Sequence, residues 1–254
     1  MSDRAPAHSV ALHVVALSGG KDSTAMALRL HEINPDTAYT YVCTPTGDEL
    51  PAMFTHWRTL GELLGKPLVP IMRKGGLRTL VHEQRALPNW RMRFCTRMLK
   101  IEPYAAWLMQ QTAHHSEVMS YVGLRADEPD REGGDYTEIP GVQSAFPLRE
   151  WQWGLDEVRA YLFSRNVEIP LRTDCARCFF QRLTEWYQLW LDHRDIFEDA
   201  ALQEAVMGAT WRSPGRDTWP ASLADLGAAF ASGQQPTPRK DDPLRSLQCR
   251  VCRT

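Results

Sequence analysis

The sequence has no long hydrophobic run, no signal-peptide pattern and little net charge. None of its apolar stretches approaches the roughly 20 residues that span a bilayer, and residues 1–9 lack a charged segment followed by an apolar one. A net charge of −2 over 254 residues gives no overall support for nucleic-acid binding and leaves only local basic patches for that purpose. We therefore expect a cytoplasmic protein with no membrane partner.

Cysteine is scarce as well, with six residues in the chain. Structural disulfides are rare in the cytoplasm, so closely spaced cysteines indicate metal or redox chemistry. Two pairs have the CxxC spacing, Cys175/Cys178 and Cys249/Cys252, whereas Cys43 and Cys95 stand alone. Because Cys43 lies inside a predicted strand, its simplest role is that of a small buried apolar residue.

Apolar strand-like runs alternate with helical periodicity in the first half of the chain. This alternation is typical of parallel strands joined by right-handed crossovers, so we predict an α/β fold with a doubly wound parallel sheet. One domain is expected over residues 10–165, and a smaller helical, cysteine-bearing region with a flexible tail over residues 166–254. The predicted strands are 12–17, 38–42, 67–72 and 118–124, and the predicted helices are 24–30, 51–64, 77–84, 102–111, 155–163 and 184–207, with a break at 193–195.

The most informative segment is the string Ser-Gly-Gly-Lys-Asp-Ser-Thr at residues 18–24, directly after the first predicted strand. Its two glycines allow a tight turn with no Cβ between the backbone and an anion. The amides of Asp22 and Ser23 then open a helix, where unpaired N–H groups and the helix dipole favour phosphate. A bare Gly-Gly turn that merely joins strand and helix is the alternative, but the whole string after a strand favours a phosphate-binding loop. It is not a Walker A loop, because the four-residue spacer before Gly-Lys is missing.

This string resembles the PP-loop of the ATP pyrophosphatase superfamily, whose members cleave ATP between the α and β phosphates. Further segments are similar, in the same order, to motifs of one branch, the phosphoadenosine phosphosulfate (PAPS) reductase-like proteins, and together they cover about residues 12–180. These segments are Thr46–Pro51, Cys95–Pro103 with Thr96 at the position of a second cysteine, Gly123–Arg131 with Pro129 at the position of a serine, and Pro147–Leu162 ahead of Cys175-x-x-Cys178.

The resemblance implies an adenine nucleotide α-hydrolase fold with ATP at the carboxyl ends of the strands. The adenine would lie near residues 43–46, and Asp22 and Asp48 would hold Mg²⁺ together with phosphate oxygens. Lys100 and Arg125 would neutralise charge that develops on phosphate. The implied nucleotide-binding residues are Ser18, Gly19, Gly20, Lys21, Asp22, Ser23, Thr46, Gly47, Gly123 and Arg125, and the implied catalytic residues are Lys21, Asp22, Lys100 and Arg125.

Two features depart from true sulfonucleotide reductases. Those enzymes usually carry a degraded loop, because their nucleotide has no pyrophosphate to cleave, whereas this chain keeps the complete ATP-type loop. Their Glu-Cys-Gly-Leu-His tail is not matched by the last residues here, Leu-Gln-Cys-Arg-Val-Cys-Arg-Thr. Both departures favour the ATP-dependent relatives, which include DNA-phosphorothioation and tRNA-thiolation enzymes.

The resemblance also implies a [4Fe–4S] cluster, because adenylyl-sulfate reductases and thiolation enzymes hold one with cysteines of these same elements. Cys95, Cys175 and Cys178 occupy the matching positions, and a fourth ligand would come from Cys249, Cys252, Cys43 or an exogenous group. Two alternatives stay open: a zinc site made of the two CxxC pairs, and free or redox-active thiols.

A basic stretch surrounds Cys95, with Arg91, Arg93 and Arg97 close to it in sequence. Such surroundings are expected to lower the pKa of the thiol and favour the metal-binding thiolate. The same arginines could meet a nucleic-acid backbone or the phosphates of the nucleotide, and a merely solvated face is the alternative.

Three functions follow as hypotheses. The favoured one is an enzyme that uses ATP to adenylate an acceptor oxygen, releases pyrophosphate, and transfers sulfur in place of AMP. The second is a sulfonucleotide reductase with Cys249 or Cys252 as nucleophile, and the third is a non-catalytic ATP-binding subunit. The acceptor would be DNA, tRNA or a small molecule, and a sulfur-donor protein and a second copy of the chain are the other partners considered.

Overall fold

A sheet of five strands forms the centre of the fold, which the computed structural model describes over residues 11–237. The strands are β1 (Leu12–Ala16), β2 (Tyr39–Cys43), β3 (Val69–Pro70), β4 (Val118–Tyr121) and β5 (Val142–Ala145). All neighbours pair in parallel, in the order β3-β2-β1-β4-β5. The predicted α/β class with a parallel, doubly wound sheet is confirmed.

Helices fill the connections between the strands and form most of the chain beyond them. They are α1 (Lys21–Ile33), α2 (Pro51–Leu63), α3 (Gly76–Gln84), α4 (Phe94–Thr96), the π-helix η1 (Arg97–Ile101), α5 (Glu102–Thr112), α6 (Pro147–Glu150), α7 (Leu155–Ser164), α8 (Leu183–Asp192), α9 (Arg194–Met207) and α10 (Leu223–Ala231). Among residues 11–237, no helix combines the length and the apolar character that crossing a membrane requires.

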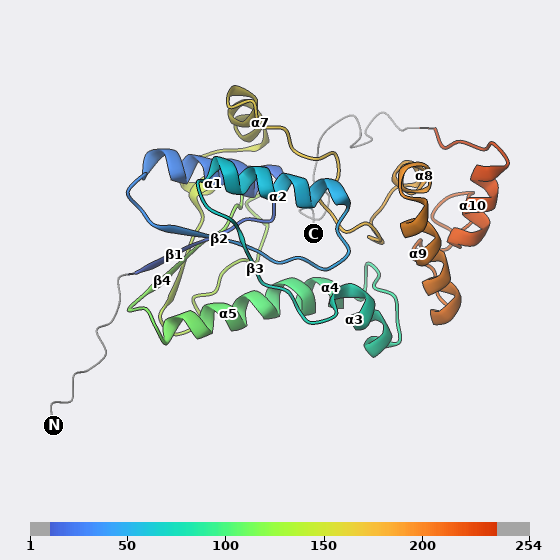
Figure 1. Cartoon of the computed structure of the whole chain (residues 1–254), viewed down its shortest axis with the longest axis horizontal. Helices are drawn as coiled ribbons and strands as arrows, with labels where there is room; N and C mark the ends of the chain where they lie inside the picture. Colours follow the sequence, from blue (N-terminus) through green and yellow to red (C-terminus); the bar gives the residue numbers. More distant parts are fainter. Residues whose placement is uncertain (1–10, 238–254) are drawn as a thin grey trace.

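Both faces of the sheet are covered, as Figure 1 shows. On one face α1, α2 and α7 contribute Leu28, Leu60 and Val158 to a single core. On the other face α5 places Tyr104 and Leu108 against the strands. Burial on both faces explains why the central strands read as continuous apolar runs rather than as alternating ones.

The order of the strands creates a crevice at one edge of the sheet. From β1 the sheet grows to one side through β2 and β3, and to the other side through β4 and β5. At such a switch point the loops that follow neighbouring strands diverge, and ligands bind outside the carboxyl ends of the strands. The loops after β1 and β4 meet at this point.

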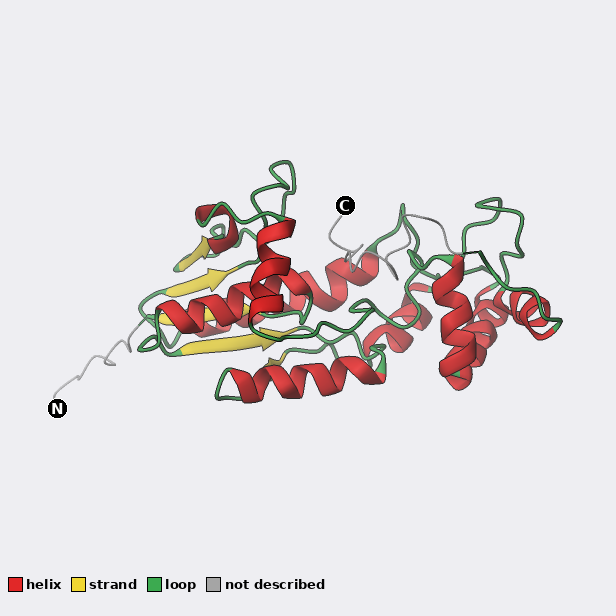
Figure 2. Ribbon diagram, turned by 90° about the horizontal axis from the view of Figure 1, so that it is seen from above, coloured by secondary structure: helices red, strands yellow, loops and turns green. Residues whose placement is uncertain are grey.

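The helices α8, α9 and α10 lie beyond one end of the α/β layers, which Figure 2 shows from above. Their core is continuous with that of α3, because Trp186, Phe197 and Phe230 share one buried cluster with Leu77 and Leu80. The helical region therefore folds onto the α/β part and positions the segment that joins the two.

Several elements differ from the sequence-based expectation. β3 has two residues rather than six, and β5 and the four-residue α6 were not predicted. The helix expected over 184–207 is broken at His193 into α8 and α9, as predicted. Helix α10 falls in a stretch rich in proline and glycine, where Ser222 caps it by accepting a hydrogen bond from the Asp225 amide at 3.1 Å.

Glu204 of α9 ties the helical region together. It is 6% exposed, and its two carboxylate oxygens accept hydrogen bonds from the amides of Trp211 at 2.7 Å and Leu223 at 2.6 Å. Burial raises the pKa of Glu204 to about 7, although these amides act in the opposite direction. The folded protein therefore binds a proton here at a pH where the unfolded chain has already released it.

We expect the protein to lose stability as the pH rises from about 5 to about 8. A folded pKa near 7 against an unfolded value of 4.5 lowers the free energy of unfolding by about 3 kcal/mol across this window. Denaturant unfolding at the two pH values measures the change. Glu204→Gln should flatten the profile, and a variant that keeps the full pH dependence would contradict this assignment.

Candidate functional site

A cavity of about 210 Å³ opens at the switch point of the sheet. Its walls come from the loop after β1, from η1 with the first turn of α5, and from the loop after β4. The structure thus gathers residues that are far apart in the sequence. The cavity is lined by the predicted residues Ser18, Gly20, Lys21, Asp22, Ser23, Lys100 and Gly123.

Hydroxyl groups hold the loop after β1 in shape. Ser18 Oγ accepts a hydrogen bond from the Gly20 amide at 3.3 Å and lies 3.0 Å from Ser23 Oγ, which donates to the Gly20 carbonyl at 3.1 Å. Gly20 is the N-cap of α1 and offers no side chain to the amides that follow. Since the first amides of a helix have no intrahelical partner, those of Lys21, Asp22 and Ser23 can bind an anion in the cavity.

Two neighbouring side chains of α2 hold the loop from behind. His56 Nε2 donates to the Gly19 carbonyl at 3.0 Å, and Trp57 Nε1 donates to the Ser18 carbonyl at 2.9 Å. Gly19 has φ +87°, and a Cβ there would lie 2.7 Å from Trp57 Nε1, so only glycine fits. Burial lowers the pKa of His56, which keeps the ring neutral next to the loop. Neither of these α2 residues belongs to a motif that could have marked it as part of the site.

Trp57→Phe should weaken the binding of a non-hydrolysable ATP analogue about three- to tenfold, because it removes one hydrogen bond that orients the loop while keeping the aromatic packing. Calorimetry measures the affinity. Trp219→Phe in the helical region is the matched control and should bind like the wild type. Equal affinities for the Trp57 variant and the wild type would show that α2 does not set the loop.

Charged side chains are concentrated at the start of α1. Asp22 Oδ2 accepts from Lys21 Nζ at 3.3 Å and from Arg125 Nη1 at 3.1 Å, whereas its Oδ1 is buried without a hydrogen-bond partner. Unsatisfied buried oxygens are rare, so Asp22 Oδ1 fits a ligand such as Mg²⁺. Arg125 is held by Asp127 at 2.8 Å and Glu128 at 2.9 Å as well. It acts on the cavity through Asp22.

The opposite wall of the cavity contains Gly123 and Lys100. A Cβ on Gly123 would lie 3.2 Å from the Ser23 backbone, so the loop after β4 approaches α1 as closely as glycine permits. Lys100 lies in η1, a π-helical turn between α4 and α5. Such turns are frequent at functional sites, and this one directs Lys100 to the cavity.

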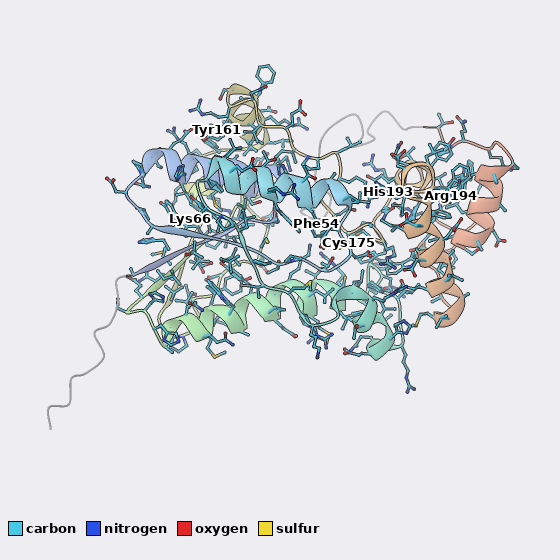
Figure 3. The ribbon with its side chains drawn as sticks, in the orientation of Figure 1. Phe54, Lys66, Tyr161, Cys175, His193 and Arg194 are labelled. Atoms are coloured by element: carbon cyan, nitrogen blue, oxygen red, sulfur yellow. The ribbon has the colours of Figure 1, made fainter. Side chains whose placement is uncertain are left out.

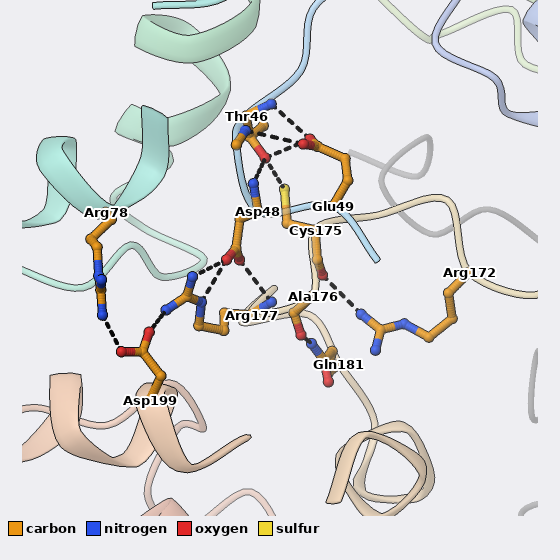
Figure 4. A network of polar contacts seen from close by, with 11 residues as sticks. Thr46, Asp48, Glu49, Arg78, Arg172, Cys175, Ala176, Arg177, Gln181 and Asp199 are labelled. Atoms are coloured by element: carbon orange, nitrogen blue, oxygen red, sulfur yellow. Dashed lines mark hydrogen bonds and ion pairs between the residues drawn. The ribbon is translucent and has the colours of Figure 1, made fainter. Parts of the chain in front are cut away.

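The loop of Thr46 and Gly47 faces the cysteines rather than the cavity. Its amides and the Thr46 hydroxyl donate to the Glu49 carboxylate at 2.6–3.0 Å. Thr46 Oγ1 also lies 3.3 Å from Cys175 Sγ (Figure 4). Thr44, two residues earlier, lines the cavity instead.

The proposed magnesium role of Asp48 needs correction. Asp48 is buried, and both of its oxygens accept hydrogen bonds from Arg177, through the backbone amide at 3.0 Å and the guanidinium Nε at 2.6 Å. Burial raises the pKa of Asp48 above its ordinary value in spite of Arg177. This carboxylate is therefore committed to an ion pair and lies in the Thr46 loop rather than on the cavity wall.

The structure describes three of the cysteines that were predicted as metal ligands, Cys95, Cys175 and Cys178. Cys175 and Cys178 form a turn in which the Cys178 amide donates to the Cys175 carbonyl at 3.2 Å. Figure 3 shows Cys175 between the α/β layers and the helical region, where His193 and Arg194 are marked. Lys100 acts electrostatically on the thiols of both Cys95 and Cys175. The same lysine therefore lines the cavity and acts electrostatically on two of the thiols.

Burial dominates the ionisation of these thiols. It raises the pKa of Cys175 to about 12 and that of Cys178 well above the ordinary value. The pKa of Cys95 is raised too, although Lys100 and Arg93 act to lower it. The expectation of a lowered pKa for Cys95 was wrong, because removal of the thiol from water outweighs the charge of its basic neighbours. Cys43 is buried as expected, with a pKa raised to about 12.

Within residues 11–237, no three His, Cys, Asp or Glu side chains come together as a site for a single metal ion. Cys249 and Cys252, which the zinc alternative requires and which were candidate cluster ligands, lie outside the described residues.

Several cavity residues were not among the predicted site residues. Tyr104 and Tyr136 stack edge to face at 5.1 Å on one wall, and the Tyr104 hydroxyl lies 2.9 Å from Ser120 Oγ. Arg131 belongs to the matched strand-end segment and also lines the cavity. The position of Arg131 at the end of that segment could have marked it as a site residue, whereas Tyr104 and Tyr136 belong to no motif.

Comparisons with known proteins found similar solved structures. Among solved structures, PAPS reductase from Candida auris in complex with phosphate is 16% identical, with a TM-score of 0.45, over 63% of this chain and 75% of that one. The U34-tRNA thiolase NcsA from Methanococcus maripaludis with its [4Fe–4S] cluster is 14% identical, with a TM-score of 0.48, over 99% of this chain and 82% of that one. No curated protein sequence matches the chain.

A family model gives the assignment. The model of the phosphoadenosine phosphosulfate reductase domain matches residues 12–172, which include the whole sheet and the residues that line the cavity. The chain therefore belongs to the phosphoadenosine phosphosulfate reductase domain family.

Proposed function

We propose that the chain is an ATP-dependent sulfur-transfer enzyme that cleaves ATP between its α and β phosphates. One observation carries the proposal: Lys100 lines the phosphate cavity and also acts on the thiols of Cys95 and Cys175. A nucleotide in the cavity and sulfur at the cysteines would then lie on two sides of one cation. We assign these tasks to residues 10–165 and residues 166–254, respectively, with Cys95 as the contribution of the first part to the second.

The nucleotide would bind through the amides that open α1. Lys21 is 6% exposed and lies beside Asp22, so its charge acts in a poorly hydrated site, where it stabilises phosphate more than it would in water. Asp22 Oδ1, buried without a partner, would hold Mg²⁺ bound to the phosphates. The side chain of Arg125 keeps Asp22 oriented for this purpose.

The reaction would proceed in two displacements. An oxygen of the acceptor attacks the α-phosphorus of ATP, the bond to the bridging oxygen breaks, and pyrophosphate leaves. A sulfur nucleophile held at the cysteines then attacks the activated carbon, the carbon–oxygen bond breaks, and AMP leaves. Lys21 and Lys100 would stabilise the charge that develops on the phosphate in the first step. A sulfur-donor protein would replenish the sulfur.

A soft metal centre would draw its ligands from the cysteines, although the described residues do not gather three of them into one group. Cys95, Cys175 and Cys178 provide three thiol ligands, one fewer than the usual four of a [4Fe–4S] cluster. A bound cluster would supply an iron atom that can carry sulfur. The protein's part would be to supply these thiolates and, through Lys100, to keep them next to the phosphates.

We propose a nucleic acid as the acceptor, on the basis of the surface beside Cys95. Trp90 is 60% exposed, and the Arg91 guanidinium stacks over it at 4.6 Å. Arg93 lies over the ring of Phe180 at 5.4 Å, which connects this loop to the segment after Cys178. An exposed aromatic ring with arginines suits stacking on an unpaired base. The alternative acceptor is a small molecule. The alternative use of this surface is contact with a second copy of the chain in a homodimer.

A second candidate function is favoured by the family itself. The matched model is that of a PAPS reductase domain, so reduction of a sulfonucleotide to sulfite competes with sulfur transfer. A non-catalytic ATP-binding subunit would use the same cavity without turnover.

Incubation of the reduced, anaerobically purified protein with labelled ATP and, separately, with a sulfonucleotide distinguishes these functions. We expect AMP and pyrophosphate from ATP, with pyrophosphate release stimulated by the acceptor. Sulfite from the sulfonucleotide without pyrophosphate from ATP would establish the reductase instead. Binding of ATP with neither product, in the presence of DNA and tRNA, would indicate the non-catalytic subunit.

A further inference from the structure

Arg177 lies inside the Cys175-x-x-Cys178 turn, and its side chain joins three separate parts of the fold (Figure 4). Its guanidinium donates to Asp48 through Nε at 2.6 Å and also through Nη2, while Nη1 donates to Asp199 of α9. Asp199 in turn accepts from Arg78 of α3. Four alternating charges therefore run from the loop after β2, through the cysteine turn, to α9 and α3.

The backbone of the cysteine turn follows the same contacts. The Ala176 amide donates to the Asp48 carbonyl at 2.6 Å, and Glu49 and Cys175 form an isolated antiparallel bridge. Arg172 holds the Cys175 carbonyl at 2.8 Å from the other side. The turn is thus fastened to the loop after β2 by main chain and side chain together.

Exposure shows which contacts are central. The side chains of Asp48 and Arg177 are 3% and 11% exposed, whereas those of Asp199 and Arg78 are 31% and 62% exposed. The inner pair lies in a poorly hydrated environment, where its geometry is enforced most strongly. The outer pair holds the free edge of the guanidinium and links it to the helical region.

We propose that Arg177 is a positioning residue, which fixes the Cys175–Cys178 turn beside the phosphate cavity, and that Asp199 and Arg78 brace it. The inference rests on the proposed function, in which these cysteines hold the sulfur. It gives the helical region a role, since α9 supplies the brace. Lysine cannot replace Arg177, because a single ammonium group cannot bond to Asp48 twice and to Asp199 at once.

Arg177→Lys tests this in the full-length protein, treated with a chelator so that no metal protects the thiols. Alkylation by iodoacetamide, followed by peptide mass spectrometry, measures the accessibility of each cysteine. We expect Cys175 and Cys178 to react about tenfold faster than in the wild type, since opening of the turn becomes easier when charged hydrogen bonds are lost. Cys43 should not change. Asp199→Asn should have a smaller effect in the same direction.

Arg165→Lys is the matched control, because Arg165 also binds one carboxylate twice, with Glu32 at 2.5 and 3.1 Å, far from the cysteines. The affinity for an ATP analogue should stay within about twofold in both variants. Equal alkylation in the Arg177 and Arg165 variants would overturn the proposal. Faster reaction of Cys43 as well would also overturn it, because Arg177 would then stabilise the whole fold. The alkylation test needs no turnover, so its outcome is independent of the proposed function. The role of Arg177 can fail this test while pyrophosphate release is observed, and it can pass while no pyrophosphate is released.

Discussion

Lys21→Ala should lower ATP-dependent pyrophosphate release about 100- to 1000-fold, the usual cost of removing one preorganised group that stabilises transition-state charge. Lys21 lies at the first position of α1, lines the cavity and is almost fully buried next to Asp22. In this environment the loss of the ammonium group leaves the Asp22 carboxylate facing the phosphates, with Arg125 as its remaining partner. Repulsion then adds to the loss of attraction.

Arg29→Ala is the control for this change. Arg29 belongs to the same helix, but its side chain is 39% exposed and pairs with Glu32 at 3.4 Å, away from the cavity. The control should release pyrophosphate at the wild-type rate, and both variants should melt within a few degrees of the wild type. If Lys21→Ala retains more than about a tenth of the activity, the cavity is not where the phosphates react.

Cys95→Ser should abolish sulfur transfer while the affinity for ATP is retained. The anaerobically purified wild type should be brown, with about four irons per chain, the usual count for a cubane. Cys95 is one of the three described cysteines that we assign to the cluster, so its loss should leave less than about one iron per chain. Iron analysis, absorbance and calorimetry with an ATP analogue measure the three effects separately.

Cys43→Ala serves as the comparison, because Cys43 is buried in β2 and should keep both the iron and the activity. If the preparation is colourless and contains one zinc per chain, and Cys95→Ser leaves this zinc unchanged, the cluster assignment is wrong. The CxxC…CxxC zinc site would then be the correct assignment. Loss of ATP binding in Cys95→Ser would contradict the assignment of nucleotide binding and of sulfur chemistry to separate groups of residues.

The fold was predictable because the sequence carries its two periodicities plainly. Apolar runs such as 12–17 suit strands buried on both faces, and their alternation with helical segments is typical of a parallel sheet between helices. β5 was not predicted, because Val142–Ala145 is a short edge strand with an exposed Gln143 and few apolar residues. Helix α10 escaped because proline and glycine surround it. Packing of Leu226 and Phe230 against the core of α3 and α8 determines it.

The candidate site could be predicted from the sequence only where its residues are neighbours along the chain. The loop at 18–24 is contiguous in the sequence, so the order of its residues alone was enough to propose those that line the cavity. The contacts from α2, in which Trp57 bonds to Ser18, depend on tertiary packing and leave no local pattern. The same limit explains Asp48, whose commitment to Arg177 across 129 positions removes it from magnesium binding. It also explains the wrong expectation for the pKa of Cys95, because the charge of neighbouring residues can be read from the sequence whereas the burial of a thiol cannot.

A structure of the protein with a non-hydrolysable ATP analogue tests the central claim most directly. We predict that the phosphates occupy the cavity between Lys21 and Lys100, within hydrogen-bonding distance of the amides that open α1. The side chain of Lys100 should lie between the α-phosphate and the thiols of Cys95 and Cys175. A nucleotide seated elsewhere, for example in the larger cavity of about 800 Å³ lined by Phe54 and Trp57 on the other side of β2, would contradict the account.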